Sequence, residues 1–556
     1  MPVHFNDSLD DQLAFDACQS FVGGQVSNVR SNLLSQTQYS DGKNIDIDRF
    51  GGVVTRHGTK RELGGILDAD WENVSSNWED YQILWDGNPP IIPGRPAKLD
   101  GVFYFDTPSL EQMITVNDQV VYKNPDGDWS VADGGDDYTP AAGANVEMAQ
   151  LVDKLYLTDG TGNVHQFDGT DFTDLGTGTG NPPICKYLVT HTNRLFAAGV
   201  SAIPDELYCS SFLTGAAGEW DNVNDNIRIG GDSGQPITGL APWMGVNLVV
   251  FKERSIFNVV ADPTAANASA WTIQNIDSNI GCVSHRSIAQ VGADLFFLAP
   301  DGIRTVRSIL EGAATAVSEP ISVGVQDVIE TINWNAARDQ ACATFWRNHY
   351  ILAVPTQSST TNNLCIVYNT VAKAFVGTWS LDATDFTTSA FGGDIKLALS
   401  TEKGGVMFFQ DYVQSDSQTE IDFQDDGENY DSHILTRAMT FGEQFSEMLP
   451  NHVEIEMKPT LSKKVQIRAG LEEGAEGIVN QTDINTETST VILPFDLPDD
   501  GSGIILGDSK PIKRQYNMIQ HGPARELQFR VKSFGNKMHL RSIKASAYVG
   551  TFDQET

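Results

Sequence analysis

The chain has 556 residues, of which 73 are acidic and 37 are Lys or Arg, and its net charge at pH 7 is −36. Proteins that bind nucleic acid through its phosphates use Lys and Arg to displace counterions, so this composition argues against general affinity for DNA or RNA. The first residues, MPVHFNDSLDDQLAF, lack the apolar segment of a secretory signal. No apolar run approaches the ~18 residues of a transmembrane helix, so we expect a soluble protein without a membrane-spanning segment, made in a cytoplasm.

Acidic residues are distributed unevenly along the chain. From Asn451 to the end there are 13 basic and 14 acidic residues, which leaves 24 basic and 59 acidic residues before that point. The first part of the chain should therefore repel DNA, whereas the C-terminal part is close to neutral.

The six cysteines show neither a CxxC motif nor a close pair. Scattered cysteines of this kind are more often buried, reduced thiols than disulfide partners, and we expect reduced thiols. They are Cys18, Cys185, Cys209, Cys282, Cys342 and Cys365.

Residues 1–92 are predicted to form an N-terminal arm with docking strands. Asn44–Asp48 alternates apolar and polar side chains, Gly51-Gly52 marks a turn, and Val53–Gly58 returns. The segment Phe5–Gly58 has too little apolar area for a core of its own, so we expect it to order by adding strands to another sheet. Three tryptophans follow, and packing on a sheet explains them better than a ligand platform. They are Trp71, Trp78 and Trp85.

A strand–turn–strand unit recurs in the middle of the chain and is clearest between Pro236 and Ser308. Apolar strands at Leu248–Phe251 and Leu295–Ala299 each lead into a tight polar turn and a returning strand, at Ile256–Val260 and Ile303–Val306. Four-strand units that repeat every ~40–50 residues are typical of β-propeller blades. Blades stack radially because a single blade cannot bury its own faces.

We therefore predict an all-β chain with a β-propeller of about seven blades at residues 93–425; six and eight blades are the alternatives. Helical signal is confined to a short connector near Val325–Asn335. Besides the pair above, the hairpins assigned to blades lie at Leu99–Val131, Val146–Leu175, Thr192–Ser211, His349–Trp379 and Ile395–Asp411.

From Ile434 the pattern changes to longer alternating strands. Five or six such strands with a Gly- and Asp-rich loop between them predict a C-terminal β-sandwich at residues 426–556. The alternating segments are His452–Met457, Lys464–Ala469, Glu526–Phe534 and Met538–Tyr548.

The stretch Asp411–Asp431 carries eight carboxylates and no Lys or Arg. A calcium loop and a solvated linker or edge strand are the two interpretations. The EF-hand pattern, in which ligands alternate around a Gly and end in a Glu, is absent, and this favours the linker.

Short motifs with catalytic associations lack the partners that their chemistry needs. Gly231-Asp232-Ser233-Gly234 resembles the nucleophile segment of trypsin-like proteases, but neither His165 nor His191 lies in a matching histidine segment. Gly176–Gly180 has no Lys-Ser/Thr after it and is not a phosphate loop. Asn124–Trp129 and Asp168–Phe172 lack the spacing of sialidase Asp-box turns. The ten histidines form no HExxH motif. We expect no catalytic residue, no cofactor and no metal ligand.

Three ordered groups of residues resemble the tail nozzle family, tail tubular protein B, of short-tailed bacteriophages. The first is Phe21-Val22-Gly23-Gly24, Gln38, Asn44, Gly51-Gly52-Val53 and Arg56-His57-Gly58. The second is Asn193–Gly199 with Leu207–Ser210. The third is Leu248–Asn258, Gly281, Asp294–Leu298 and Asp301–Arg304. The resemblance covers most of the chain, and the order of the groups is its most specific feature.

This resemblance implies a structural virion protein and not an enzyme. A nozzle subunit would form a homo-oligomeric ring, hexameric in the family, below the tail adaptor protein, with tail fibres as a further candidate partner. Viral DNA would pass through the lumen of the ring during ejection without specific binding, and not through the propeller's own pore. An acidic lumen would let phosphates slide past. The protein would be assembled in the host cytoplasm and reside in the virion tail.

The alternative is a secreted glycan-binding or glycan-cleaving β-propeller. Glycoside cleavage uses a pair of carboxylates, and sialidases grip their substrate with arginines. The sequence shows neither set and no signal peptide, so it favours the nozzle.

Overall fold

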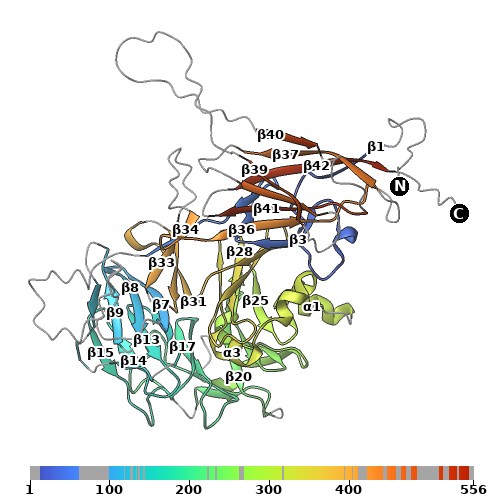
Figure 1. Cartoon of the computed structure of the whole chain (residues 1–556). Coiled ribbons are helices and arrows are strands. Elements are labelled where there is room, and N and C mark those ends of the chain that lie inside the picture. The colour runs from blue at the N-terminus through green and yellow to red at the C-terminus, as the bar shows by residue number, and fades with distance from the viewer. Residues whose placement is uncertain are drawn as a thin grey trace, which may run out of the picture.

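The structure, a computed structural model, describes residues 13–61, 99–117, 119–125, 129–132, 134–135, 138–141, 144–221, 224–231, 234–261, 268–315, 319–393, 395–402, 405–410, 423–441, 448–458, 465–470, 478–484, 512–517, 525–534 and 538–549. It confirms a nearly all-β chain in which a β-propeller lies beside a β-sandwich (Figure 1). In the part of the chain described, no helix is long and apolar enough to cross a membrane.

The described strands form seven blades, as the sequence predicted, and β31 of blade seven contacts β7 of blade one to close the ring. Blades one to three are β7 (Gly101–Thr107), β8 (Leu110–Asn117), β9 (Gln119–Lys123), β10 (Trp129–Val131); β12 (Glu147–Leu151), β13 (Lys154–Thr158), β14 (His165–Phe167), β15 (Asp171–Asp174) with β11 (Gly134–Gly135); and β16 (Tyr187–His191), β17 (Arg194–Ala198), β18 (Glu206–Cys209), β19 (Asn226–Arg228). Blades four and five are β20 (Ile237–Trp243), β21 (Asn247–Lys252), β22 (Ile256–Val260), β23 (Thr272–Asp277); and β24 (Ala289–Val291), β25 (Asp294–Ala299), β26 (Gly302–Thr305). Blades six and seven are β27 (Cys342–Trp346), β28 (His349–Val354), β29 (Leu364–Asn369), β30 (Ala374–Trp379); and β31 (Ala383–Ser389), β32 (Lys396–Thr401), β33 (Val406–Phe409), β6 (Thr59–Arg61).

Local turn chemistry sets the hairpins of the blades. Thr192 and Asn193 join β16 to β17 with φ of 47° and 59°, and Arg347 and Asn348 join β27 to β28 with φ of 46° and 67°. Two consecutive residues with positive φ define the type I′ turn, whose twist matches that of the flanking strands.

Each blade supplies side chains to the cores on both of its sides. In β17, Leu195 and Ala197 pack in the core shared with blade two, whereas Phe196 and Ala198 pack in the core shared with blade four. Successive side chains of a strand point to opposite faces of the sheet, so a strand buried on both faces is continuously apolar. This is why the blade strands lack an alternating pattern in the sequence.

Blade five has three strands among the described residues, and a helix that the sequence did not predict follows it. Helix α1 (Val306–Thr315) places Val306 and Ile309 in the core between blades four and five. Thr305 Oγ1 accepts a hydrogen bond from Ser308 N at 3.0 Å, the geometry of an N-cap. The expected connector near Val325–Asn335 is helical as well. It consists of α2 (Gln326–Glu330) and α3 (Trp334–Gln340), after the 3₁₀ turn η6 (Ile321–Val325).

The sandwich is built jointly by the N-terminal arm and the C-terminal region. One sheet contains β1 (Leu13–Cys18), β4 (Ile45–Ile47), β5 (Val53–Thr55), β37 (Met448–Met457), β40 (Ile512–Asn517) and β42 (His539–Val549). The other contains β2 (Gly24–Gln25), β3 (Gln38–Lys43), β36 (Asp431–Thr436), β41 (Gln528–Phe534), β38 (Val465–Gly470) and β39 (Ile478–Ile484), and it continues into β30 of blade six. The arm adds strands to a sheet as expected, but the sheet belongs to its own chain.

The arm also closes the propeller. Strand β6 is the fourth strand of blade seven and pairs with β33. Its residue Arg61 is paired with Met407, which lies 346 residues later in the chain. The short hairpin β34 (Gln424–Asp425) and β35 (Glu428–Asn429) then pairs with β6. The expected boundary at residue 92/93 lies outside the described residues, and the one at 425/426 falls within this hairpin.

Arg56 lies where the arm, the propeller and the sandwich meet, a region that we call the joint. Its side chain is 1% exposed, and its guanidinium grips both carboxylate oxygens of Asp425. Its Nε donates to Asn44 Oδ1 at 3.0 Å, and its Cζ lies 4.0 Å from the centre of the Tyr430 ring. Burial lowers the pKa of Arg56, but Asp425 more than offsets this effect, so the pKa is raised overall. Arg56 therefore stays charged, and Asp425 balances that charge inside the protein.

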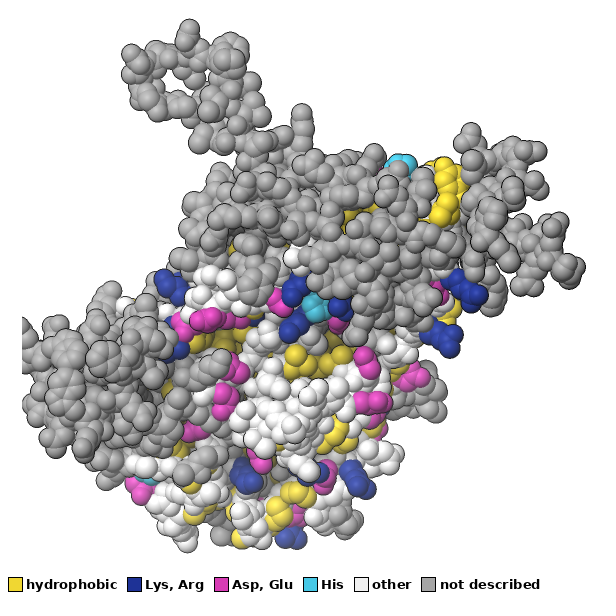
Figure 2. Space-filling model, in the orientation of Figure 1, with side chains coloured by type: hydrophobic (Ala, Val, Ile, Leu, Met, Phe, Trp, Pro, Cys, Tyr) yellow, Lys and Arg dark blue, Asp and Glu magenta, His cyan; other side chains and the backbone are white. Residues whose placement is uncertain are grey.

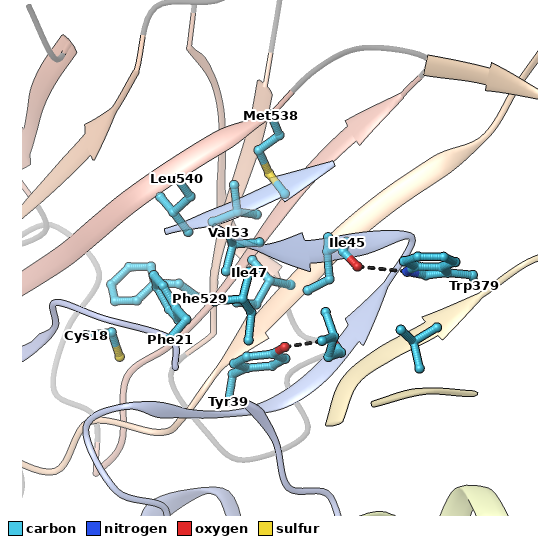
Figure 3. Close-up of a cluster of buried hydrophobic side chains, with 14 of the residues drawn as sticks. Cys18, Phe21, Tyr39, Ile45, Ile47, Val53, Trp379, Phe529, Met538 and Leu540 are labelled. Carbon is cyan, nitrogen blue, oxygen red and sulfur yellow. Dashed lines mark hydrogen bonds between the residues drawn. The ribbon is translucent and has the colours of Figure 1, made fainter. Parts of the chain in front are cut away.

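The apolar core behind this joint merges the sandwich with blades six and seven. Figure 3 shows Tyr39 and Ile45 of the arm facing this core, with Phe529 and Leu540 from the C-terminal strands. Tyr39 Oη donates to Val376 O at 2.6 Å, and Trp379 Nε1 donates to Ile45 O at 2.8 Å. All six cysteines are buried free thiols, as the sequence predicted.

Three histidines pair with three carboxylates of the arm. The Nε2–Oδ distances are 2.9 Å for His433–Asp41, 2.9 Å for His349–Asp46 and 2.8 Å for His539–Asp48. These histidines come from β36, β28 and β42. The arm is thus held by one histidine–carboxylate contact to blade six and one to each sandwich sheet.

His349 is protonated in this arrangement. Its Nδ1 lies 2.9 Å from Arg347 O and its Nε2 lies 2.9 Å from Asp46 Oδ1, and both of these oxygens can only accept. Burial lowers the pKa of His349, but the charge and hydrogen bond of Asp46 raise it overall above 6.5. Asn369 and the Trp379 ring face the same imidazole.

The joint should lose stability as the pH rises above neutral. A histidine whose folded pKa is raised stabilises the fold below its unfolded pKa of about 6.5, and this contribution disappears as the pH rises through the folded value. For Asp48 the reverse holds. Burial raises its pKa, but His539 and two backbone N–H groups lower it to about 2, so its contribution is lost only in acid. We expect His349→Gln to flatten the fall in melting temperature between pH 6 and 9, measured by scanning calorimetry.

His165→Gln is the matched control, because that ring lies in blade two, away from the joint. An unchanged pH profile in His349→Gln, identical to that of the control, would contradict this assignment of charge.

Candidate functional site: the propeller channel

A cavity of about 330 Å³ lies in the channel of the propeller. It is lined from six blades, mainly by their innermost strands β7, β12, β16, β20 and β31, and by the 3₁₀ turn η5 (His285–Ser287) with β24. Its charged lining residues are Glu147, His285, Arg286 and Asp385. A cavity of this size lies at the lower end of the range for small-molecule sites and is far too small to pass duplex DNA.

Three separate segments position these groups. Glu147 opens β12, and Asp385 lies in β31 next to a register shift in its pairing with β32. Ser284 ends the extended segment before η5, so His285 and Arg286 enter the channel together. Ser287 Oγ donates a hydrogen bond to the backbone carbonyl Ser284 O at 2.6 Å and stabilises this tight turn.

His285 is neutral in this geometry. Leu240 N donates to its Nδ1 at 3.2 Å, so Nδ1 carries no proton. The proton therefore lies on Nε2, which donates to Glu147 Oε1 at 3.1 Å. The ring also packs on Tyr187, with 4.9 Å between ring centres. The network thus fixes both the tautomer and the orientation of the imidazole.

Arg286 and Asp385 form a mostly buried ion pair, with 2.9 Å between Nη2 and Oδ2. Val102 N also donates to Asp385 Oδ2 at 3.2 Å. Burial raises the pKa of Asp385; Arg286 lowers it, and the net shift is upward. Burial opposes the charge of Arg286 too, but Asp385 raises its pKa overall. The charges of Arg286 and Asp385 balance each other. The Glu147 carboxylate is then the charge of the cavity that no cation balances among the described residues.

Sequence reasoning did not identify these four residues. They come from blades two, five and seven, and no short motif joins them. The one local signal is the adjacent His285-Arg286 pair in a segment that otherwise reads as apolar strand and turn.

The motifs that the sequence did single out have structural roles where they are described. Asp168 Oδ1 accepts from Thr170 N and Asp171 N, a local turn in which no ligand is needed. Gly176, Gly178 and Gly180 have φ of 62°, 118° and 87° and form a turn-rich loop. His165 and His191 lie in blades two and three, and burial lowers the pKa of His191.

Other candidate motifs fall partly or wholly outside the described residues. These are Asp232 and Ser233, residues 126–128, the three tryptophans Trp71, Trp78 and Trp85, and residues 411–422 of the acidic stretch. The described end of that stretch pairs with cations: Asp425 with Arg56, Asp426 with Arg61 and Asp431 with Lys532. No group of three or more His, Cys, Asp or Glu side chains suited to a metal occurs among the described residues.

Neither a protein-family model nor a curated protein matches the sequence. Among solved structures, the chain is similar to BamB from Moraxella catarrhalis, with a TM-score of 0.35, 10% identity, and coverage of 66% of this chain and 96% of that one. It is also similar to the WD40 β-propeller domain of Doa1, with a TM-score of 0.35, 9% identity, and coverage of 57% and 95%. A third is PorZ of Porphyromonas gingivalis, with a TM-score of 0.34, 12% identity, and coverage of 64% and 43%.

The ion pair between Arg286 and Asp385 should stabilise the folded protein. Asp385→Asn should destabilise the protein by about 3–5 kcal/mol, because it leaves Arg286 buried without its counter-charge. The double variant Asp385→Asn/Arg286→Gln should recover part of that loss, measured as a double-mutant cycle in chemical denaturation. Strictly additive losses in the double variant would mean that the two side chains do not interact.

Proposed function

We propose that the chain is a structural subunit of a short phage tail, one copy of a homo-oligomeric nozzle ring that encloses the path of the viral DNA. The observation that carries this proposal is the spatial arrangement of the first group of residues that resembles the nozzle family. Phe21, Gly24, Asn44, Arg56 and Gly58 of this group lie at the joint between arm, propeller and sandwich, although each alone is a common turn or strand residue.

Four of these positions have contacts that restrict which residue can stand there. Phe21 is fully buried in the shared core. A side chain at Gly24 would lie 2.4 Å from Phe375 O, and one at Gly58 would lie 1.9 Å from Gln424 O. Asn44 has a φ of 52°, is fully buried and donates to Ser380 Oγ at 2.8 Å and Asp431 O at 2.7 Å.

An ordered motif with several members at one joint supports a shared architecture more strongly than the same residues scattered over the surface would. This architecture makes the propeller and sandwich one continuous body, which suits a protein that has to transmit load within a tail.

The charge distribution also supports a subunit that DNA passes without binding. The net charge is −36, and many described arginines are committed to ion pairs, among them Arg56, Arg61 and Arg304. On the face shown in Figure 2, acidic and basic side chains are interspersed over the described part of the propeller. Each phosphate that a fixed cation neutralises strengthens binding, so a ring with many such contacts would hold the genome in place.

A glycan-binding or glycan-cleaving propeller is the second candidate, and the channel favours it in one respect. Glu147 and Asp385 stand on different blades and face the same cavity. For cleavage, one carboxylate has to act as an acid while the other acts as a nucleophile or base. Here Asp385 is bound by Arg286 and by a backbone N–H, and Glu147 is bound by His285. These contacts suit a binding site better than a hydrolase.

Cryo-electron microscopy of the purified full-length protein tests whether the chain forms a nozzle ring. We expect closed rings whose bore admits duplex DNA and is lined by acidic or neutral side chains with isolated Lys and Arg. We also expect no retardation of duplex DNA in a gel at low salt. A monomer at all concentrations, or a continuous basic belt around the bore, would contradict the proposal. Release of sugar from a glycan by the wild type but not by Glu147→Gln would establish the second candidate instead.

A further inference from the structure

The channel cavity carries one excess negative charge. Since Leu240 N donates to Nδ1 of His285, that imidazole is neutral and cannot balance Glu147. The positive charge of Arg286 is matched by Asp385 at 2.9 Å. In this geometry Glu147 is the charged side chain of the cavity that has no cationic partner of its own among the described residues.

Glu147 also has unused acceptor capacity. Its Oε1 receives the hydrogen bond from His285, whereas its Oε2 receives none from any residue that the structure describes. Its side chain is 19% exposed and lines the cavity. An ionised carboxylate offers about four lone-pair directions, so it can accept further hydrogen bonds from a donor in the cavity.

We propose that the channel cavity binds a small organic cation, an ammonium group on a short aliphatic body, with Glu147 as its counter-charge. This site is independent of the proposed role in a tail. The ammonium group would donate to Oε2, and its charge would neutralise the excess charge of the cavity. Charge-assisted hydrogen bonds of this kind are about twice as strong as neutral ones.

The walls of the cavity suit the aliphatic part of such a ligand. The lining includes apolar side chains from several blades: Val102, Phe103, Met148, Leu240, Ile288 and Phe386. Small-molecule sites commonly combine an apolar wall with a few placed polar groups, and 330 Å³ suits a small ligand. An anion would meet the uncompensated carboxylate.

A divalent metal fits the cavity less well than an organic cation does. The described residues contain no group of three or more side chains suited to hold a metal. Nε2 of the neutral His285 carries the proton that it donates to Glu147, so this nitrogen cannot be a metal ligand at the same time.

Isobutylammonium is a suitable probe, and isobutanol is its neutral isostere. Binding to the full-length protein can be followed by saturation-transfer NMR and by titration calorimetry at pH 7. We expect saturable binding of isobutylammonium and at least about tenfold weaker binding of isobutanol.

Glu147→Gln removes the charge but keeps the side-chain shape and the acceptor for His285, so it should weaken isobutylammonium binding by at least about tenfold. Glu311→Gln, the same change on the exposed surface of α1, should leave binding unchanged. Circular dichroism confirms that both variants are folded.

Three results would overturn the proposal. They are no saturable binding of isobutylammonium to the wild type, equal binding to Glu147→Gln, and equal binding of isobutanol. Tighter binding of a neutral sugar than of the ammonium would assign the cavity to a polyol instead. None of these outcomes depends on whether the protein forms rings, so the test is separate from that of the nozzle.

Discussion

The bidentate contact between Arg56 and Asp425 joins the arm to the first hairpin of the C-terminal region. Taking a guanidinium out of water costs several kcal/mol unless its donors are satisfied, and here Asp425, Asn44 and a backbone carbonyl satisfy them. Asp425 in turn accepts from Thr59 N and Oγ1, the first residue of β6. The burial of one cation therefore fixes the arm, the closing strand of the propeller and the first hairpin of the C-terminal region relative to one another.

The same principle explains why two histidines of this chain carry different charges. His349 has an acceptor oxygen at each ring nitrogen, Arg347 O and Asp46 Oδ1, and is held as a cation against Asp46. His285 accepts a backbone N–H and is held neutral. The first is part of the joint, where the cation balances a buried carboxylate of the arm. The second leaves Glu147 uncompensated inside the channel. At His349 the charge and the hydrogen bonds of its partners together outweigh the effect of burial.

Features set by local chemistry could be predicted from the sequence. The blade hairpins were found because turn residues and apolar runs recur, and the strands Ile256–Val260 and Leu295–Ala299 match the structure within a residue. The shared sandwich could not be derived in this way, because its pairing depends on contacts such as Asn44 with Asp431, 387 residues apart. The channel cluster was missed for the same reason. Helix α1 was not predicted, because blade five was expected to continue as a strand. Thr305, which caps the helix, is a residue type that favours this position.

Native-state hydrogen exchange tests directly whether propeller and sandwich form one cooperative body joined through the arm. We expect the amides of β6, β30 and β36 to exchange with one common free energy of opening in the wild type. We also expect Arg56→Met to lower that free energy for all three strands together, while exposed Arg307→Met changes none of them. If β36 opened in Arg56→Met while β6 and β30 kept their wild-type protection, the sandwich would be an independent domain, which contradicts a single cooperative body.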